Sequence, residues 1–243
     1  MNISAPARSA GVLAALTVIN GVAQRTWLPA DLVVPVGVLA LVAGARASGL
    51  RADEMGLGIE AASRGLAAAG LAAAMTVAGV AAATGLPGAD GLRVDERYSS
   101  PTTARRAAFT RIPLAVAIPE ELAFRGVLDA ALRRHLTSSS ASAWGAVAFG
   151  AWHALGATTL TRDNAGLGRA VGPGPLSAAV GVAGAVVATA VAGLGFLALR
   201  RRSDSVLSGI AVHWALNATA ALAAGLRRPP RADACRPARA GIQ

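Results

Sequence analysis

Runs of apolar residues long enough to cross a lipid bilayer dominate this chain and restrict the folds open to it. A helix needs about 20 residues to cross the apolar part of a bilayer. Stretches that approach this length occupy residues 10–24, 32–47, 65–86, 107–134, 140–160, 176–199 and 206–226. The backbone polar groups of such stretches find no water in lipid and have to be satisfied internally. The pattern predicts an all-α fold, a polytopic transmembrane helix bundle with about seven to eight membrane segments.

The composition supports a membrane location and excludes nucleic acid as a partner. Of the 243 residues 54% are hydrophobic and 15% are charged, against about 25% charged residues in an ordinary soluble domain. The net charge of +10 comes from arginine alone, since the chain has no lysine. The arginines gather at segment boundaries, which suits anionic lipid headgroups, and no basic patch with interleaved aromatic residues is present. We expect a multi-pass protein of the cell membrane that has the lipid bilayer as a partner.

The chain divides into three parts. Residues 1–106 hold the first membrane segments and a polar loop, residues 107–226 hold the segments that carry buried polar residues, and residues 227–243 form a basic polar tail. The single cysteine, Cys235, lies in this tail and excludes an internal disulfide and a cysteine-rich metal site.

Three ionisable residues occur together in the apolar segment 107–134, within the stretch "PEELAFRG" (119–126). Each ionisable group inside a membrane span costs about 2.5–3.5 kcal/mol, so such groups are candidates for function. Glu121 and Arg125 are four residues apart and can pair on one helix face, whereas Glu120 points about 100° away and stays available. We expect Pro113 and Pro119 to bend this segment. Pro119 would begin a new helical stretch whose positive dipole end favours the two carboxylates.

Two further segments contribute polar groups. "FGAWH" places Phe149 one turn before His153, so that the ring can cover one side of the imidazole, and "HWALN" places His213 and Asn217 on one face. Taken singly, a membrane histidine or a Glu–Arg pair more often serves packing between helices. Together these groups predict a hydrolytic site with a glutamate as general base, an imidazole that orients water and donors for an oxyanion.

The three motifs and their order resemble a known family. "EELAFR" fits E-E-x-x-x-R, "FGAWH" fits F-x-x-x-H and "HWALN" fits H-x-x-x-N, in this order on three separate membrane segments. The chain resembles the CPBP intramembrane proteases, which include CAAX prenyl proteases and the bacteriocin-processing or immunity relatives called Abi proteins. The resemblance covers about residues 107–226, which would be the catalytic core.

The resemblance implies a glutamate-dependent endopeptidase that hydrolyses a membrane-associated peptide or protein. Carried over by position, Glu120 and His153 would activate the attacking water, and His213 and Asn217 would stabilise the oxyanion. Glu121 and Arg125 would support the site. No cofactor is expected.

Alternative functions remain open at this point. A zinc-dependent protease would use Glu120, His153 and His213 as ligands, but no H-E-x-x-H pair exists and the site would then lack a free base. The chain could also be a non-catalytic immunity or scaffold protein of the same family. A small transporter that uses the buried carboxylates as a proton relay is a further alternative, which a fixed Glu121–Arg125 pair disfavours.

Overall fold

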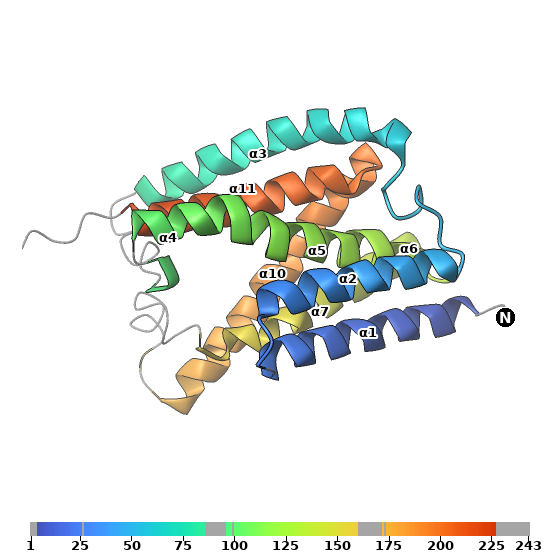
Figure 1. Ribbon diagram of the computed structural model, residues 1–243, viewed down its shortest axis with the longest axis horizontal. Coiled ribbons are helices and arrows are strands. Elements are labelled where there is room, and N and C mark those ends of the chain that lie inside the picture. The colour runs from blue at the N-terminus through green and yellow to red at the C-terminus, as the bar shows by residue number, and fades with distance from the viewer. Residues whose placement is uncertain are drawn as a thin grey trace, which may run out of the picture.

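The structure is a computed structural model of the chain, and it describes residues 4–25, 27–85, 96–98, 100–159, 172 and 174–226. Within these ranges the chain folds into helices and contains no strand, so the predicted all-α bundle is confirmed. The basic tail 227–243 and Cys235 lie outside the described residues. Figure 1 shows the arrangement: the long helices run side by side, and α10 crosses them at an angle.

The helix bounds agree with the predicted segments to within a few residues at most ends. Two long helices come first, α1 (Ala5–Arg25) and α2 (Ala30–Ala47), followed by a short 3₁₀ turn (Ile59–Ala61) and α3 (Ala62–Gly85). After a second 3₁₀ turn (Glu96–Tyr98), a helix runs over residues 101–133. The chain then forms α7 (Ser138–Ala154), a 3₁₀ turn (Gly156–Thr159), α10 (Pro175–Ser203) and α11 (Val206–Gly225).

Five helices of the described chain are long and apolar enough to cross a membrane: α1, α2, the helix at 59–83, α10 and α11. The other two predicted segments differ from these for physical reasons. Helix α7 has 17 residues, which corresponds to a length of about 26 Å. The helix at 101–133 carries several charged residues in its interior.

The helix at 101–133 continues through both prolines, which corrects one prediction. It consists of α4 (Pro101–Arg106), a π-helical stretch (Ala107–Ala117), α5 (Ile118–Glu121), a second π-helical stretch (Leu122–Leu128) and α6 (Asp129–Arg133). Ala117 has helical dihedral angles, φ −65° and ψ −51°, so Pro119 does not begin a new helix. The N–H of Ile118 donates to the carbonyl of Pro113, five residues back. This wider turn accommodates residues that lack an N–H.

The continuity of this helix removes one source of stabilisation that the sequence suggested. A helix N-terminus offers free N–H groups and a positive dipole end. Because no helix begins at Pro119, Glu120 and Glu121 lie in a helix interior. Their charges must therefore be compensated by side chains, which come from the same helix and from its neighbours.

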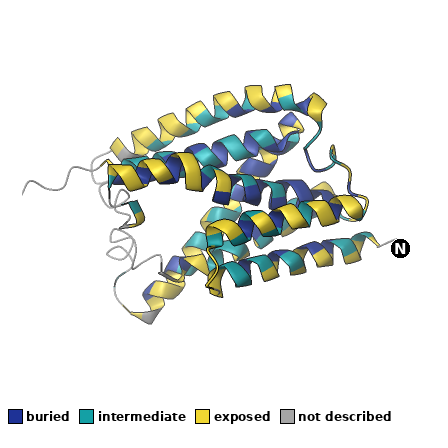
Figure 2. Ribbon diagram, in the orientation of Figure 1, coloured by how far each residue is buried: buried dark blue, intermediate teal, exposed yellow. Residues whose placement is uncertain are grey.

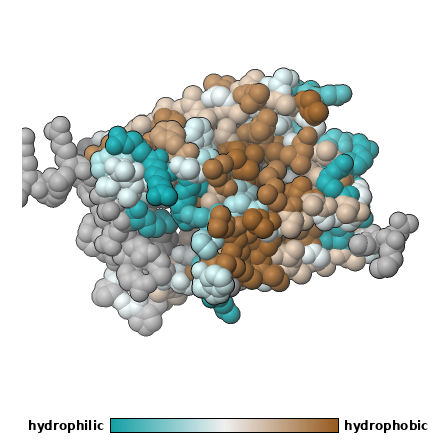
Figure 3. Space-filling view, viewed as in Figure 1, coloured by the Kyte–Doolittle hydropathy of each residue, from teal (hydrophilic) through white to brown (hydrophobic). Residues whose placement is uncertain are grey.

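Burial and hydropathy follow the pattern of a membrane bundle. In Figure 2 the buried residues face the centre of the bundle, and the outer face of α3 is exposed. Large apolar side chains point outward from several helices, among them Leu39, Leu71, Val147 and Val191. Figure 3 shows that the hydrophobic residues form a band across the molecule, with hydrophilic residues toward both ends. Such a band is too apolar to face water, and it suits the lipid bilayer that the sequence predicts.

Charge pairs join the elements at one end of the bundle. Asp129 on α6 is buried and accepts a hydrogen bond of 2.6 Å from Arg201 on α10. Arg134 donates to the carboxylate of Glu54 in the loop after α2. These contacts fix α10 and the loop against the helix that carries the two glutamates.

Candidate active site

All the polar residues that the sequence singled out as catalytic line one cavity of about 420 Å³ between the helix at 101–133, α7, α10 and α11. Glu120 reaches it from α5, and Phe149 and His153 reach it from α7. His213 and Asn217, one turn apart on α11, complete the wall. Residues separated by almost a hundred positions in the chain therefore meet in one place. The cavity is large enough for a few residues of an extended peptide and is lined by apolar as well as polar groups.

The carboxylate of Glu120 is held on one oxygen and left unpaired on the other. The side chain is buried, with 7% of its surface exposed. Its Oε1 accepts a hydrogen bond of 3.1 Å from the indole Nε1–H of Trp152. Its Oε2 lies 3.7 Å from Nε2 of His153 and 3.9 Å from Nε2 of His213, and it has no hydrogen-bond partner among the described residues. These separations are too long for direct hydrogen bonds and fit a shared water molecule.

The hydrogen bond at Nδ1 of His153 defines the tautomer of the ring, and so the role of Nε2 beside Glu120. Nδ1 of His153 lies 2.8 Å from the backbone carbonyl of Phe149. A carbonyl can only accept, so this contact assigns the proton to Nδ1. In the neutral ring, Nε2 then carries a lone pair directed toward the carboxylate of Glu120. A water molecule between them can donate one hydrogen to each group.

Two hydrogen-bond partners compensate the charge of Glu121. It is fully buried, and its Oε1 accepts hydrogen bonds of 3.0 Å from Nη1 of Arg125 and 3.0 Å from Nδ1 of His213. The spacing in the sequence predicted the first of these contacts. It could not show the second, because the register between the helix at 101–133 and α11 is a tertiary property. Glu121 therefore ties the arginine and the histidine into one buried network.

Aromatic rings enclose this network. The guanidinium of Arg125 lies 3.9 Å from the ring centroid of Phe149 and 5.2 Å from that of Phe196, distances at which a cation is attracted to a ring face. Phe149 also contacts the imidazole of His153 edge to face at 4.7 Å, and Phe196 stacks on His213 at 5.0 Å. The sequence predicted the contact of Phe149 with His153. It gave no signal for Phe196, which stands in an unbroken apolar stretch.

Glycines bring the neighbouring helices close to the buried charges. A Cβ atom at Gly209 on α11 would lie 2.6 Å from Oε2 of Glu121, and one at Gly193 on α10 would lie 2.7 Å from Nη2 of Arg125. Both contacts are closer than real Cβ atoms approach. Glu121 and Arg125 cannot retreat without breaking their shared hydrogen bond. A side chain at either glycine would therefore displace one member of the pair.

We expect Gly209→Ala to lower the free energy of unfolding by about 1–3 kcal/mol, because the added methyl group displaces the carboxylate of Glu121. Equilibrium unfolding in mixed micelles measures this effect. Gly184→Ala is the matched control, since a Cβ atom there meets nothing within 4 Å; it should be neutral or slightly stabilising through better helix propensity. Equal effects of the two substitutions would contradict the close approach of α11 to Glu121.

Metal ligation was the main chemical alternative. Within the described part of the chain, no group of three or more histidine, cysteine, aspartate or glutamate side chains is placed to hold a metal ion. A zinc ion bound by Glu120, His153 and His213 would leave Glu121 as the remaining carboxylate, and Glu121 is already bonded to Arg125 and His213. The arrangement therefore suits Glu120 as a free general base better than as a zinc ligand. The metal requirement itself is a question for chelation.

Comparison with known proteins agrees with the motifs. Residues 103–219 match the family model described as "Type II CAAX prenyl endopeptidase Rce1-like". No curated protein and no solved structure matches the chain. The matched range holds the three motifs and most of the cavity lining, and the protease family predicted from these motifs is confirmed. Together with the five candidate spans, the match indicates a multi-pass membrane protein. Residues 103–219 therefore belong to the Rce1-like type II CAAX prenyl endopeptidases, a family of membrane proteases.

Proposed function

We propose that the chain is a glutamate-dependent intramembrane endopeptidase in which Glu120 and His153 activate a water molecule. One observation carries this proposal: the buried Oε2 of Glu120 has no hydrogen-bond partner in the described chain and lies 3.7 Å from Nε2 of His153. A carboxylate with a free oxygen beside an imidazole acceptor is the arrangement that general-base catalysis needs. No cofactor takes part in the proposed reaction.

The reaction proceeds in two proton-coupled steps. Water, hydrogen-bonded to Oε2 of Glu120 and to Nε2 of His153, attacks the scissile carbonyl carbon while its proton passes to Glu120. The carbonyl π bond breaks, and its oxygen becomes an oxyanion. Glu120 then returns the proton to the amide nitrogen, the C–N bond breaks, and the carbonyl re-forms. The products are a new carboxyl terminus and a free amine.

His213 and Asn217 stabilise the oxyanion in this scheme. His213 in its imidazolium form, with Nδ1–H bonded to Glu121, donates from Nε2, and the side-chain amide of Asn217 donates from the same wall of the cavity. Arg125 and Glu121 hold His213 in place through their shared hydrogen bonds. Donors that are fixed before the reaction lower the energy of the developing negative charge most effectively.

The substrate we propose is a membrane-associated peptide or protein. The catalytic cavity lies among helices whose outer faces are apolar, so a substrate that is anchored in or near the bilayer reaches it by diffusion within the membrane. The family description names prenyl endopeptidases, which makes a prenylated peptide one candidate. A bacteriocin leader or another membrane protein is the other, and the cell membrane is the proposed location.

Substrate capture followed by chelation tests the proposal. The Glu120→Gln variant, purified from the membranes of cells that express it, should retain uncleaved substrate. Mass spectrometry of the co-purified proteins identifies this substrate. A farnesylated peptide serves as a parallel probe. Reconstituted wild-type protein should cleave the captured substrate at a rate that exhaustive chelation changes by less than about twofold, because no metal is required. Loss of cleavage on chelation, restored by zinc, would assign the reaction to the metal-dependent alternative. Absence of any cleavage by the wild type would favour the non-catalytic immunity or scaffold protein.

A further inference from the structure

Trp152 contacts Glu120, the proposed general base, and occupies none of the positions that define the three motifs. Its indole Nε1–H donates to Oε1 of Glu120 over 3.1 Å. This bond is the one that distinguishes the two carboxylate oxygens: Oε1 is engaged, and Oε2 faces the imidazoles. A carboxylate with equivalent, unbonded oxygens could rotate away from the water that it has to deprotonate.

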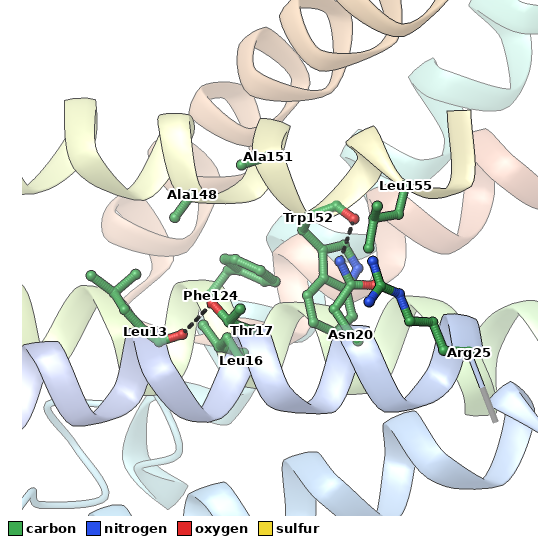
Figure 4. A pocket seen from close by; sticks show the side chains of 11 residues that line it. Leu13, Leu16, Thr17, Asn20, Arg25, Phe124, Ala148, Ala151, Trp152 and Leu155 are labelled. Carbon is green, nitrogen blue, oxygen red and sulfur yellow. Dashed lines mark hydrogen bonds between the residues drawn. The ribbon is translucent and has the colours of Figure 1, made fainter. Parts of the chain in front are cut away.

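The indole ring of Trp152 is itself held on its other sides. It packs edge to face against Phe124, a member of the main hydrophobic cluster, with ring centroids 5.6 Å apart. It also borders a second cavity, of about 460 Å³, that lies between α1 and α7. Figure 4 shows this second cavity, with Trp152 of α7 facing Leu16 and Asn20 of α1. Trp152 therefore lines the cavity that lacks the catalytic groups, while its N–H reaches Glu120 of the catalytic cavity.

Asn20 fixes the backbone of Trp152 from α1. Its side-chain amide is buried and donates to the carbonyl oxygen of Trp152 over 2.9 Å, as the dashed line in Figure 4 shows. Helix α7 ends at Ala154, and carbonyls in the last turn of a helix lack partners within that helix. A buried amide in an apolar helix is costly unless it is bonded. The residue is therefore placed where it satisfies an otherwise open carbonyl in the turn that carries Trp152 and His153.

We propose that Trp152 is a positioning residue for Glu120 and that Asn20 positions Trp152 in turn. This inference rests on the proposed function, since Glu120 must be the base for its orientation to matter. It also places part of the catalytic apparatus in α1, outside residues 103–219 that match the protease family. The chain of contacts runs from Asn20 through the last turn of α7 to the carboxylate.

Trp152→Phe removes the N–H donor and keeps an aromatic ring against Phe124. We expect kcat to fall between about tenfold and a hundredfold, as for other hydrogen bonds to charged groups, while KM changes less than about twofold because Trp152 borders the other cavity. The matched control is Trp144→Phe, the same substitution on the same helix at a position that is 58% exposed; it should leave both constants unchanged. Equal kcat values for Trp152→Phe and the wild type would overturn the positioning role, and so would a change confined to KM.

Asn20→Leu tests the second link by its coupling to Trp152. The single variant Asn20→Leu should lower kcat by less than Trp152→Phe does, because the indole N–H is still present and only its position is less fixed. In the Trp152→Phe background it should have almost no further effect, as expected for residues that act through one another. Fully additive losses would show that Asn20 acts independently of Trp152 and would overturn its positioning role.

A spectroscopic measurement separates this inference from the proposed function. The chain has four tryptophans, so indole ¹H–¹⁵N spectra of the labelled protein in micelles contain few signals, and Trp152→Phe identifies the relevant one. That signal should move on Glu120→Gln, because the acceptor loses its charge. The signal of Trp214, whose N–H donates to the carbonyl of Ala108, should stay in place. A stationary Trp152 signal would overturn the inference even if cleavage depends on Glu120, and a moving signal in a protein without protease activity would leave the contact intact and reject the proposed function.

Discussion

Replacing Glu120 by glutamine lowers kcat/KM by about 10²–10⁴-fold, the range that a general base contributes. The carboxamide keeps the size of the side chain, and its oxygen can still accept from Trp152. It cannot take the proton of the attacking water at Oε2, where the wild-type carboxylate faces His153. Initial rates on the captured substrate in liposomes measure the effect, together with a thermal unfolding curve to show that the fold is unchanged.

The control for this variant is Glu60→Gln. Glu60 lies in the 3₁₀ turn before α3 and is exposed, so the same chemical change there should leave kcat/KM unaltered. A Glu120→Gln variant that retains cleavage at the wild-type rate would remove the base from the mechanism. If the biological activity of the chain also survived, the immunity or scaffold alternative would take its place.

Replacing Arg125 by leucine lowers the free energy of unfolding by about 3–5 kcal/mol, as expected when one partner of a buried ion pair is removed. Arg125 has 3% of its side chain exposed and donates to Glu121, which has no exposed surface. Without the guanidinium, Glu121 keeps a charge in an apolar interior with His213 as its remaining partner. The contact of Arg125 with the face of Phe149 is lost as well. Equilibrium unfolding in mixed micelles gives the difference.

The matched substitution is Arg111→Leu. Arg111 also lies on the helix at 101–133 and pairs with Asp31 of α2, but both side chains are 46% exposed. Exposed pairs contribute between zero and about 1 kcal/mol, so this variant should unfold almost as the wild type does. Similar losses in the two variants would mean that burial does not set the strength of the Glu121–Arg125 pair.

Contacts within one helix could be predicted from the sequence, because helix geometry fixes them. The four-residue spacing predicted the Glu121–Arg125 pair, and the structure has it at 3.0 Å. The same spacing placed Phe149 next to His153, and the rings are in contact. The cost of burying charge in lipid explained why Glu120 and Glu121 had to be functional candidates.

Contacts between helices could not be predicted in this way. The hydrogen bond from His213 to Glu121 depends on the register between α11 and the helix at 101–133. Gly209 allows the backbone of α11 to come close to Glu121 in this register. The bond from Trp152 to Glu120 crosses from α7 to α5. Asn20 is a lone polar residue in an apolar segment, and such a residue gives no hint of its partner.

The local conformation of the helix at 101–133 could not be predicted from the sequence either. Proline usually kinks or ends a helix, and this led to the wrong prediction that a helix begins at Pro119. Pro113 lies in the first π-helical stretch, and Pro119 lies in α5 between the two π-helical stretches. The proposed division at residue 106 remains a prediction; that position lies within this continuous helix.

Oxygen-isotope labelling in a single turnover tests the central claim most directly, namely that a water molecule between Glu120 and His153 is the nucleophile. With enzyme in excess over substrate in H₂¹⁸O, the new carboxyl terminus of the product should carry one ¹⁸O atom, and the peptide that contains Glu120 should stay unlabelled. A first-turnover product without ¹⁸O, together with ¹⁸O in the carboxylate of Glu120, would show that Glu120 attacks the substrate itself and would contradict the account.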